Sequence, residues 1–217
     1  MALIRVINPN SNQSVTDAIA ASLKGFAIPG RIDIVCETLE TGPIGIENER
    51  HVASVAIPMV NRMKTRSADA YVIACYSDPA LALAREELGV PVFGIMQSAV
   101  MQACTLGTRF GVIALSNPAI KRHERGLRAM GMLQHLAAER AINSSVAASA
   151  DADAFVALQK AGRALRDEDG ADIVILGCAG MARHRTALQD ALGIPVIDPT
   201  QAGVASAMSV LLVSATT

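Results

Sequence analysis

The chain has 217 residues, of which 51% are hydrophobic and 18% are charged, and its formal net charge is −1. This length can bury one large core or two small ones, and the hydrophobic share excludes a disordered protein. The balanced charge provides no basic face, and aromatic residues make up only 3%, so we expect no nucleic-acid partner.

Apolar runs alternate with helical patterns along the whole chain. The apolar runs are continuous, which is typical of parallel strands covered on both faces. The first half predicts strands at 2–8, 31–37, 70–75 and 90–95 and helices at 13–24, 49–65 and 79–88. A helix at 97–106 leads into the second half, which predicts strands at 109–115, 134–139, 172–177 and 194–197 and helices at 118–130, 152–168, 183–191 and 201–213. Pro58 predicts a kink in the second helix or a later start for it.

An internal repeat relates the two halves. Residues 69–75 read DAYVIAC and residues 172–178 read DIVILGC, and the motifs LGVPV at 88–92 and LGIPV at 192–196 follow them. We therefore expect an α/β fold of two similar flavodoxin-like lobes with parallel sheets, related by a pseudo-two-fold axis, with the active site in the cleft between them. The expected first lobe is 1–96 plus the C-terminal helix region 201–217, and the second is 97–200.

Two of the four cysteines, Cys75 and Cys178, end equivalent strands of this repeat. A pseudo-two-fold axis would place the two thiols on opposite sides of one cleft, where they can reach both faces of one carbon atom. Cys36 and Cys104 fall within a strand and a helix and are expected to be structural. The cysteine spacings match no zinc template, so we expect no metal site.

The loops beyond the strands are short and polar, and ligands of open parallel sheets bind at this edge. They comprise residues 8–12, 41–47, 75–79, 114–118 and 178–181. The candidate substrate-binding residues in them are Asn8, Asn10, Ser11, Tyr76, Ser77, Ser116, Ala179 and Gly180. A single Asn or Ser before a helix is also an ordinary N-cap. The prediction therefore depends on the whole set converging on the two thiols.

Other chemistries fit the sequence poorly. The loop 8–12 lacks the glycines of a dinucleotide or phosphate-binding fingerprint, and the four lysines lie in polar helical stretches, so we expect no cofactor. His184 is expected to face solvent, and the run 122–125 is expected to be a solvated helix face or a subunit contact. Because the candidate loops carry almost no cations, a neutral five-membered cyclic imide fits better than a dicarboxylate amino acid.

The chain resembles the aspartate/glutamate/hydantoin racemase superfamily, and most of all its hydantoin/allantoin racemase branch. The resemblance spans nearly the whole chain and is carried by INPNSN at 7–12, GPIGIE at 42–47, IACYSDP at 73–79, PVFGI at 91–95 and GCAGMA at 177–182. It implies a cofactor-independent racemase with Cys75 and Cys178 as acid and base. It also implies a substrate held by the loops already named. Gln97, Leu115 and Gly45 depart from the family pattern and bear on which substrate is accepted.

Three alternatives remain open at this point. The same fold serves aspartate or glutamate racemases, and it serves maleate isomerases and malonate decarboxylases, of which the decarboxylases need one cysteine and not two. A non-enzymatic protein that clamps a small molecule between its lobes is the third. We expect a small-molecule substrate, no membrane partner, a homo-oligomer and a cytoplasmic location, because no secretory signal or membrane-length apolar run is visible.

Overall fold

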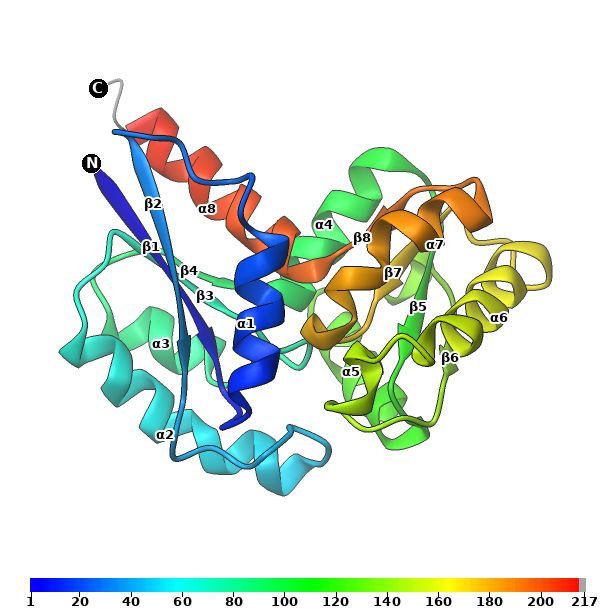
Figure 1. Cartoon of the computed structure of the whole chain (residues 1–217), viewed down its shortest axis with the longest axis horizontal. Helices are drawn as coiled ribbons and strands as arrows, with labels where there is room; N and C mark the ends of the chain where they lie inside the picture. The colour runs from blue at the N-terminus through cyan, green and yellow to red at the C-terminus, as the bar shows by residue number, and fades with distance from the viewer. Residues whose placement is uncertain (215–217) are drawn as a thin grey trace.

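Two four-stranded sheets form the two lobes of the computed structural model, which describes residues 1–214 (Figure 1). The first has the order β2-β1-β3-β4 and consists of β1 (Ala2–Asn8), β2 (Ile32–Thr38), β3 (Ala70–Ile73) and β4 (Val92–Gly94). The second has the order β6-β5-β7-β8 and consists of β5 (Phe110–Ala114), β6 (Leu136–Ala141), β7 (Ile173–Leu176) and β8 (Val196–Ile197). All pairings between these strands are parallel, and the matching orders confirm the predicted two-lobe α/β fold.

Helices cover the sheets and follow one another along the chain in the predicted order. They are α1 (Gln13–Ser22), α2 (Glu49–Thr65), α3 (Leu81–Glu87), α4 (Ile95–Leu106), α5 (Asn117–Ala129), α6 (Ala154–Asp167), α7 (Arg185–Leu192) and α8 (Pro199–Ser214). Short 3-10 segments occur at Leu133–His135, Ala148–Ala150 and Ala179–His184. The helix predicted at 183–191 therefore begins as a 3-10 turn. Pro58 lies inside an uninterrupted α2, so that helix does not begin late.

Burial explains why the central strands are continuous apolar runs. Every residue of β3, β5 and β7 is buried, as expected for strands covered on both faces. Local polar contacts set where helices begin. The Asn12 side chain accepts a hydrogen bond from the backbone N–H of Ser14 and caps α1, and Asn48 accepts one from His51 and caps α2.

The last helix, α8, returns from the second sheet to the first lobe. It packs against α4 and against β1, β3 and β4, as Figure 1 shows in red and orange. Gly203 permits this close approach, because a Cβ atom there would lie 2.9 Å from Cγ1 of Val72. This packing supports the proposed assignment of the C-terminal helix to the first lobe. Residues 215–217 of that assignment lie outside the described residues.

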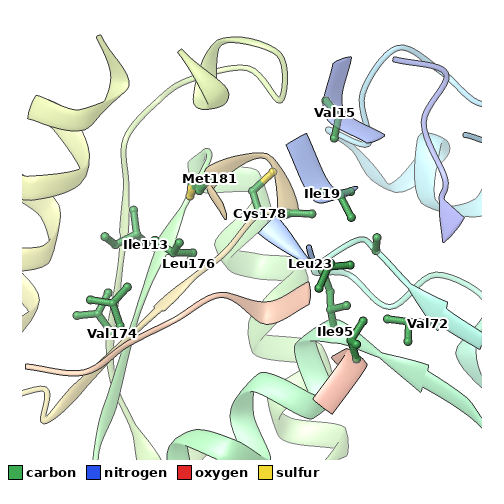
Figure 2. Packing of buried hydrophobic residues seen from close by; sticks show 14 of the residues in the cluster. Val15, Ile19, Leu23, Val72, Ile95, Ile113, Val174, Leu176, Cys178 and Met181 are labelled. Atoms are coloured by element: carbon green, nitrogen blue, oxygen red, sulfur yellow. The ribbon is translucent and has the colours of Figure 1, made fainter. Parts of the chain in front are cut away.

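One buried apolar cluster runs through both lobes (Figure 2). It joins Val15 and Ile19 of α1 in the first lobe to Ile113 and Leu176 in the second. Figure 2 shows Cys178 between these two groups. The lobes are therefore packed together directly, and the second cysteine lies where they meet. Within residues 1–214, no helix is both long and apolar enough to cross a membrane.

Candidate active site

Cys75 and Cys178 occupy equivalent places in the two lobes. Each follows its strand after one small residue, Ala74 beyond β3 and Gly177 beyond β7. Cys75 is half-buried and Cys178 is buried, and both are free thiols. Both line the same cavity between the lobes. The repeat therefore brings the two thiols to one site, as expected.

The cavity encloses about 440 Å³ of empty space, including the open space at its mouth. Its wall mixes apolar side chains with a few polar groups and consists of Asn10, Val15, Ile46, Ala74, Cys75, Tyr76, Ser77, Leu115, Ala119, Arg122, His123, Val146, Gly177, Cys178, Ala179 and Gly180.

Seven of the ten predicted site residues belong to this wall: Asn10, Cys75, Tyr76, Ser77, Cys178, Ala179 and Gly180. Asn8 lies behind it and fixes Asn10. The Asn8 side chain donates to Oδ1 of Asn10 at 3.0 Å and accepts from the Asn10 backbone N–H at 3.2 Å. The Ser11 backbone N–H donates to the carbonyl of Pro43, and Ser116 is the N-cap residue of α5. These three residues support the loops without forming the wall.

The thiol of Cys178 lies at the start of the 3-10 segment Ala179–His184. Its Sγ accepts a hydrogen bond from the backbone N–H of Gly180 at 3.4 Å, and Oγ of Ser149 lies 4.0 Å away. Burial raises the pKa of Cys178, the Gly180 N–H and Ser149 act to lower it, and Asp198 and Glu47 act to raise it.

Burial has the same effect on the other thiol and raises the pKa of Cys75 to about 12. The backbone N–H of Ser77 and the charge of Arg122 act in the opposite direction, whereas Cys178 and Asp78 raise this pKa further. Each cysteine therefore accepts a hydrogen bond from the backbone N–H of the residue two positions after it in the chain. Both donors favour the thiolate, and burial favours the thiol.

The loop after Cys75 is held by Asp78. Its carboxylate accepts the backbone N–H groups of Met96 and Gln97, both at 2.9 Å, at the start of α4. Gly94 must lack a side chain here, because a Cβ atom would lie 2.3 Å from the carboxylate. Asp78 adopts a φ of +43°, a strained conformation for a residue with a side chain. The loop that carries Cys75 is thus fixed against the next helix.

Two residues of the wall, Arg122 and His123, correct the expectation of a solvated helix face. His123 is buried, its Nδ1 lies 2.8 Å from Oε2 of Glu139, and its ring packs edge-to-face on Tyr76 with centroids 4.8 Å apart. Nη1 of Arg122 donates to the carbonyl of Glu47 at 3.1 Å, across the cleft. A signal in the sequence was available, because His123 lies one turn from Ala119 on the buried stripe of α5.

His184 is buried, which corrects the expectation that it faces solvent. It ends the 3-10 segment, and its ring centroid lies 6.1 Å from that of Phe155. Burial and the neighbouring Arg183 lower the pKa of His184. His184 is not part of the cavity wall.

A loop of the first lobe reaches the second lobe at the cavity mouth. Oε1 of Glu47 accepts the backbone N–H of Val146 at 3.3 Å, and Glu49 pairs with Arg125 at 2.7 Å. Ile46 and Val146 both line the cavity beside these contacts. The lobes are therefore tied together by polar contacts at the mouth as well as by the apolar core.

The three residues that depart from the family pattern, Gly45, Gln97 and Leu115, lie in different parts of the structure. Leu115 lies in the wall, and Gly45 packs on Val146, which a Cβ atom would approach to 3.1 Å. Gln97 lies outside the wall, where its Oε1 accepts a hydrogen bond from Arg85 at 2.7 Å. Leu115 is therefore the one of the three that touches the cavity.

Comparisons with known proteins agree with one another. The family model described as Asp/Glu/Hydantoin racemase matches residues 4–207. A hydantoin racemase of Paenarthrobacter aurescens is 32% identical, covering 96% of this chain and 90% of that protein, and one of a Pseudomonas species is 35% identical, covering 96% and 85%. The structure of an allantoin racemase from Klebsiella pneumoniae superposes with a TM-score of 0.91 at 30% identity, covering 99% of this chain and 89% of that one.

Proposed function

The chain belongs to the Asp/Glu/hydantoin racemase family and is a racemase, and we propose that it inverts carbon 5 of 5-substituted hydantoins or of allantoin by means of two cysteines. The observation that carries this proposal is the position of Cys75 and Cys178 at equivalent strand ends in the wall of one cavity. The relatives named as hydantoin racemases and the allantoin racemase structure support the choice of ring.

The proposed reaction begins with one cysteine as thiolate and the other as thiol. The thiolate removes the hydrogen of carbon 5, and the electron pair moves into the adjacent carbonyl to give an enolate. The thiol then gives its proton to the opposite face of the same carbon, which inverts it. The first cysteine ends as a thiol and the second as a thiolate, so the enzyme is ready for the opposite enantiomer.

The electrostatic environment of the thiols supports a mechanism in which either cysteine can be the thiolate. The N–H groups of Ser77 and Gly180 point at the two sulfurs and stabilise whichever is ionised. The enclosed, largely apolar wall strengthens these contacts because little water competes with them. Asn10 and the loops around the cysteines then position the ring.

Three further properties are part of the proposal. The enzyme works without a cofactor, because a two-thiol proton transfer is complete in itself. It works in the cytoplasm, where reducing conditions keep thiols such as these four unpaired cysteines reduced. It acts as a homo-oligomer.

The decisive experiment is the decay of optical rotation from single enantiomers of 5-benzylhydantoin, 5-isopropylhydantoin, allantoin and aspartate. We expect decay with at least one hydantoin-type substrate and none with aspartate. The Cys104→Ser variant is the matched control, because Cys104 is partly exposed and lies outside the cavity wall. Racemisation of aspartate alone would replace the proposal by an amino-acid racemase. Binding without exchange of the carbon-bound hydrogen would make the chain a binding protein.

A further inference from the structure

The cavity wall contains one permanent charge among its described residues, the guanidinium of Arg122, and no Asp or Glu. Arg122 is on the first half of α5 in the second lobe, yet its charge acts on Cys75 of the first lobe and favours the Cys75 thiolate. It therefore lies within electrostatic reach of the reacting sulfur. The sequence had indicated a neutral pocket, since the loops alone carry almost no cations.

Some N–H groups of the Arg122 guanidinium have no hydrogen-bond acceptor among the described residues. Nη1 donates to two backbone carbonyls, of Glu47 at 3.1 Å and of Pro118 at 3.3 Å. Nε is buried and has no hydrogen-bond partner among the described residues. A buried donor without an acceptor costs roughly 1–3 kcal/mol. No carboxylate of residues 1–214 forms an ion pair with Arg122, and the charge of Glu49 raises the pKa of Arg122 only from beyond ion-pair distance.

The third nitrogen, Nη2, has no hydrogen-bond partner among the described residues and is not buried, so an anion in the cavity would find it free to donate. A guanidinium N–H forms a strong, charge-assisted hydrogen bond with a carboxylate. The carbonyl bonds of Nη1 hold the guanidinium in place, and the burial that lowers the pKa of Arg122 also strengthens its attraction for an anion. His123, the next residue, adds a polar ring to the same side of the wall.

We propose that Arg122 binds an anionic group of the substrate, so that the preferred substrate is a hydantoin-type ring whose substituent at carbon 5 ends in a carboxylate. This inference rests on the proposed function for the ring, and it adds the chemical class of the substituent. The carboxylate pairs with Arg122 on the α5 side of the cavity while carbon 5 lies between the two thiols. Arg122 is then a specificity-determining residue that neither gives nor accepts the transferred proton.

The first test is independent of substrate turnover. Iodoacetate and iodoacetamide alkylate a thiolate by the same displacement, forming a carbon–sulfur bond and releasing iodide, but only iodoacetate is an anion. We expect the ratio of the iodoacetate to the iodoacetamide rate constant at Cys75, followed by peptide mass spectrometry, to fall at least tenfold in Arg122→Gln. Because both reagents need the thiolate, a change in the pKa of Cys75 cancels in this ratio. Cys104 supplies the internal reference, and its ratio should stay the same.

The second test uses matched substrates. Hydantoins with a carboxymethyl or a carbamoylmethyl group at carbon 5 have nearly the same shape and differ in charge. We expect the wild-type protein to favour the acid in kcat/KM by at least tenfold, Arg122→Gln to lose this preference while still racemising the amide, and Arg122→Lys to keep part of it. Thermal unfolding of each variant checks that the fold is intact.

The outcomes separate the two proposals. An unchanged alkylation ratio in a folded Arg122→Gln protein, or equal losses with both hydantoins, overturns the role of Arg122 and leaves the racemase proposal standing. A changed ratio with no turnover of either hydantoin supports the anion site and overturns the hydantoin ring as substrate. Preference for a free acidic amino acid would show that the anion site serves a different substrate class.

Discussion

Cys178 and Gly180 are joined by a hydrogen bond in which the Gly180 backbone N–H donates to Sγ at 3.4 Å. The same relation exists between Cys75 and the N–H of Ser77 in the other lobe. A backbone donor two residues after each cysteine gives both thiolates a fixed stabilising contact that needs no charged side chain. The internal repeat therefore duplicates the environment of the sulfur as well as its position.

Replacing either cysteine by serine should separate the two half-reactions. In Cys75→Ser, the Cys178 thiolate still removes the hydrogen from the enantiomer that presents it, but no thiol stands opposite. In D₂O that enantiomer should gain deuterium without inversion, and its mirror image should stay protiated. Cys178→Ser should show the reverse preference. Proton NMR of each pure enantiomer measures this, with Cys104→Ser expected to behave as wild type.

Near wild-type racemisation by either variant would require a different acid or a single base. Loss of exchange for both enantiomers in both variants would mean that the cysteines do not act independently. The experiment thus distinguishes one-base, two-base and concerted mechanisms with one set of samples.

The dependence of activity on pH should reflect the buried thiols. The thiolate is the active base, and burial raises the pKa of Cys75 to about 12, so the ionised fraction in the empty site falls tenfold for each pH unit below that value. We expect kcat/KM to rise with pH through 7 to 10, approaching a slope of one on logarithmic axes. A 3-methylhydantoin is the suitable substrate, since it lacks the imide proton that would titrate in this range. A maximum near neutral pH would contradict the prediction.

Gly180 should tolerate no side chain. A Cβ atom there would lie 2.9 Å from Oγ of Ser149 and 3.6 Å from Sγ of Cys178, so Gly180→Ala must displace Ser149 or the loop itself, and each of these supplies a contact that favours the Cys178 thiolate. A hydrogen bond to a charged group contributes roughly 1.5–3 kcal/mol, and we expect kcat/KM to fall about 10- to 100-fold. Gly25→Ala is the matched control, because a Cβ at Gly25 meets no atom within 4 Å. Equal activity of the two variants would show that this crowding does not disturb the contacts of the Cys178 sulfur.

The sequence was sufficient to place both cysteines because their position depends on local pattern. A buried parallel strand is recognisable as an apolar run, and the residue just beyond its carboxyl end lies at the ligand-binding edge in either lobe. Cys75 and Cys178 each end such a run, and the repeat predicts their common cavity. Asn10, Ser77 and Gly180 were found by the same reasoning, since each lies in a loop at that edge.

The side chains of α5 and of the 3-10 segment could not be placed in this way. Charged neighbours suggested that Arg122 and His123 face water, but His123 shares the buried stripe of its helix and pairs with Glu139 of β6. Arg122 reaches Glu47 only because the lobes pack together, a long-range relation that no local pattern contains. His184 was misjudged because it was expected near the start of a helix, whereas it ends the 3-10 segment that follows Cys178 and is buried there.

Asp198 should make the stability of the protein depend on pH. Its Oδ1 accepts the backbone N–H of Thr200 at 2.8 Å, while Oδ2 is buried without a partner among the described residues. Burial raises the pKa of Asp198 from 3.8 to about 6. Because the folded pKa is the higher one, this carboxyl contributes most to stability below pH 4, and the contribution is lost as pH rises through 6.

Asp198→Asn tests this relation, because asparagine keeps the Oδ1 acceptor and does not titrate. The rise in pKa corresponds to on the order of 3 kcal/mol, so the free energy of unfolding should fall less between pH 4 and pH 7.5 in the variant than in wild type. Urea unfolding at several pH values measures it. Burial also raises the pKa of Asp78 to about 6, so part of the dependence of stability on pH should remain in the Asp198→Asn variant. Asp190→Asn, at an exposed site on α7, should leave the wild-type dependence unchanged. If Asp198→Asn and wild type show parallel pH profiles, the Asp198 carboxylate is not the buried charge inferred here.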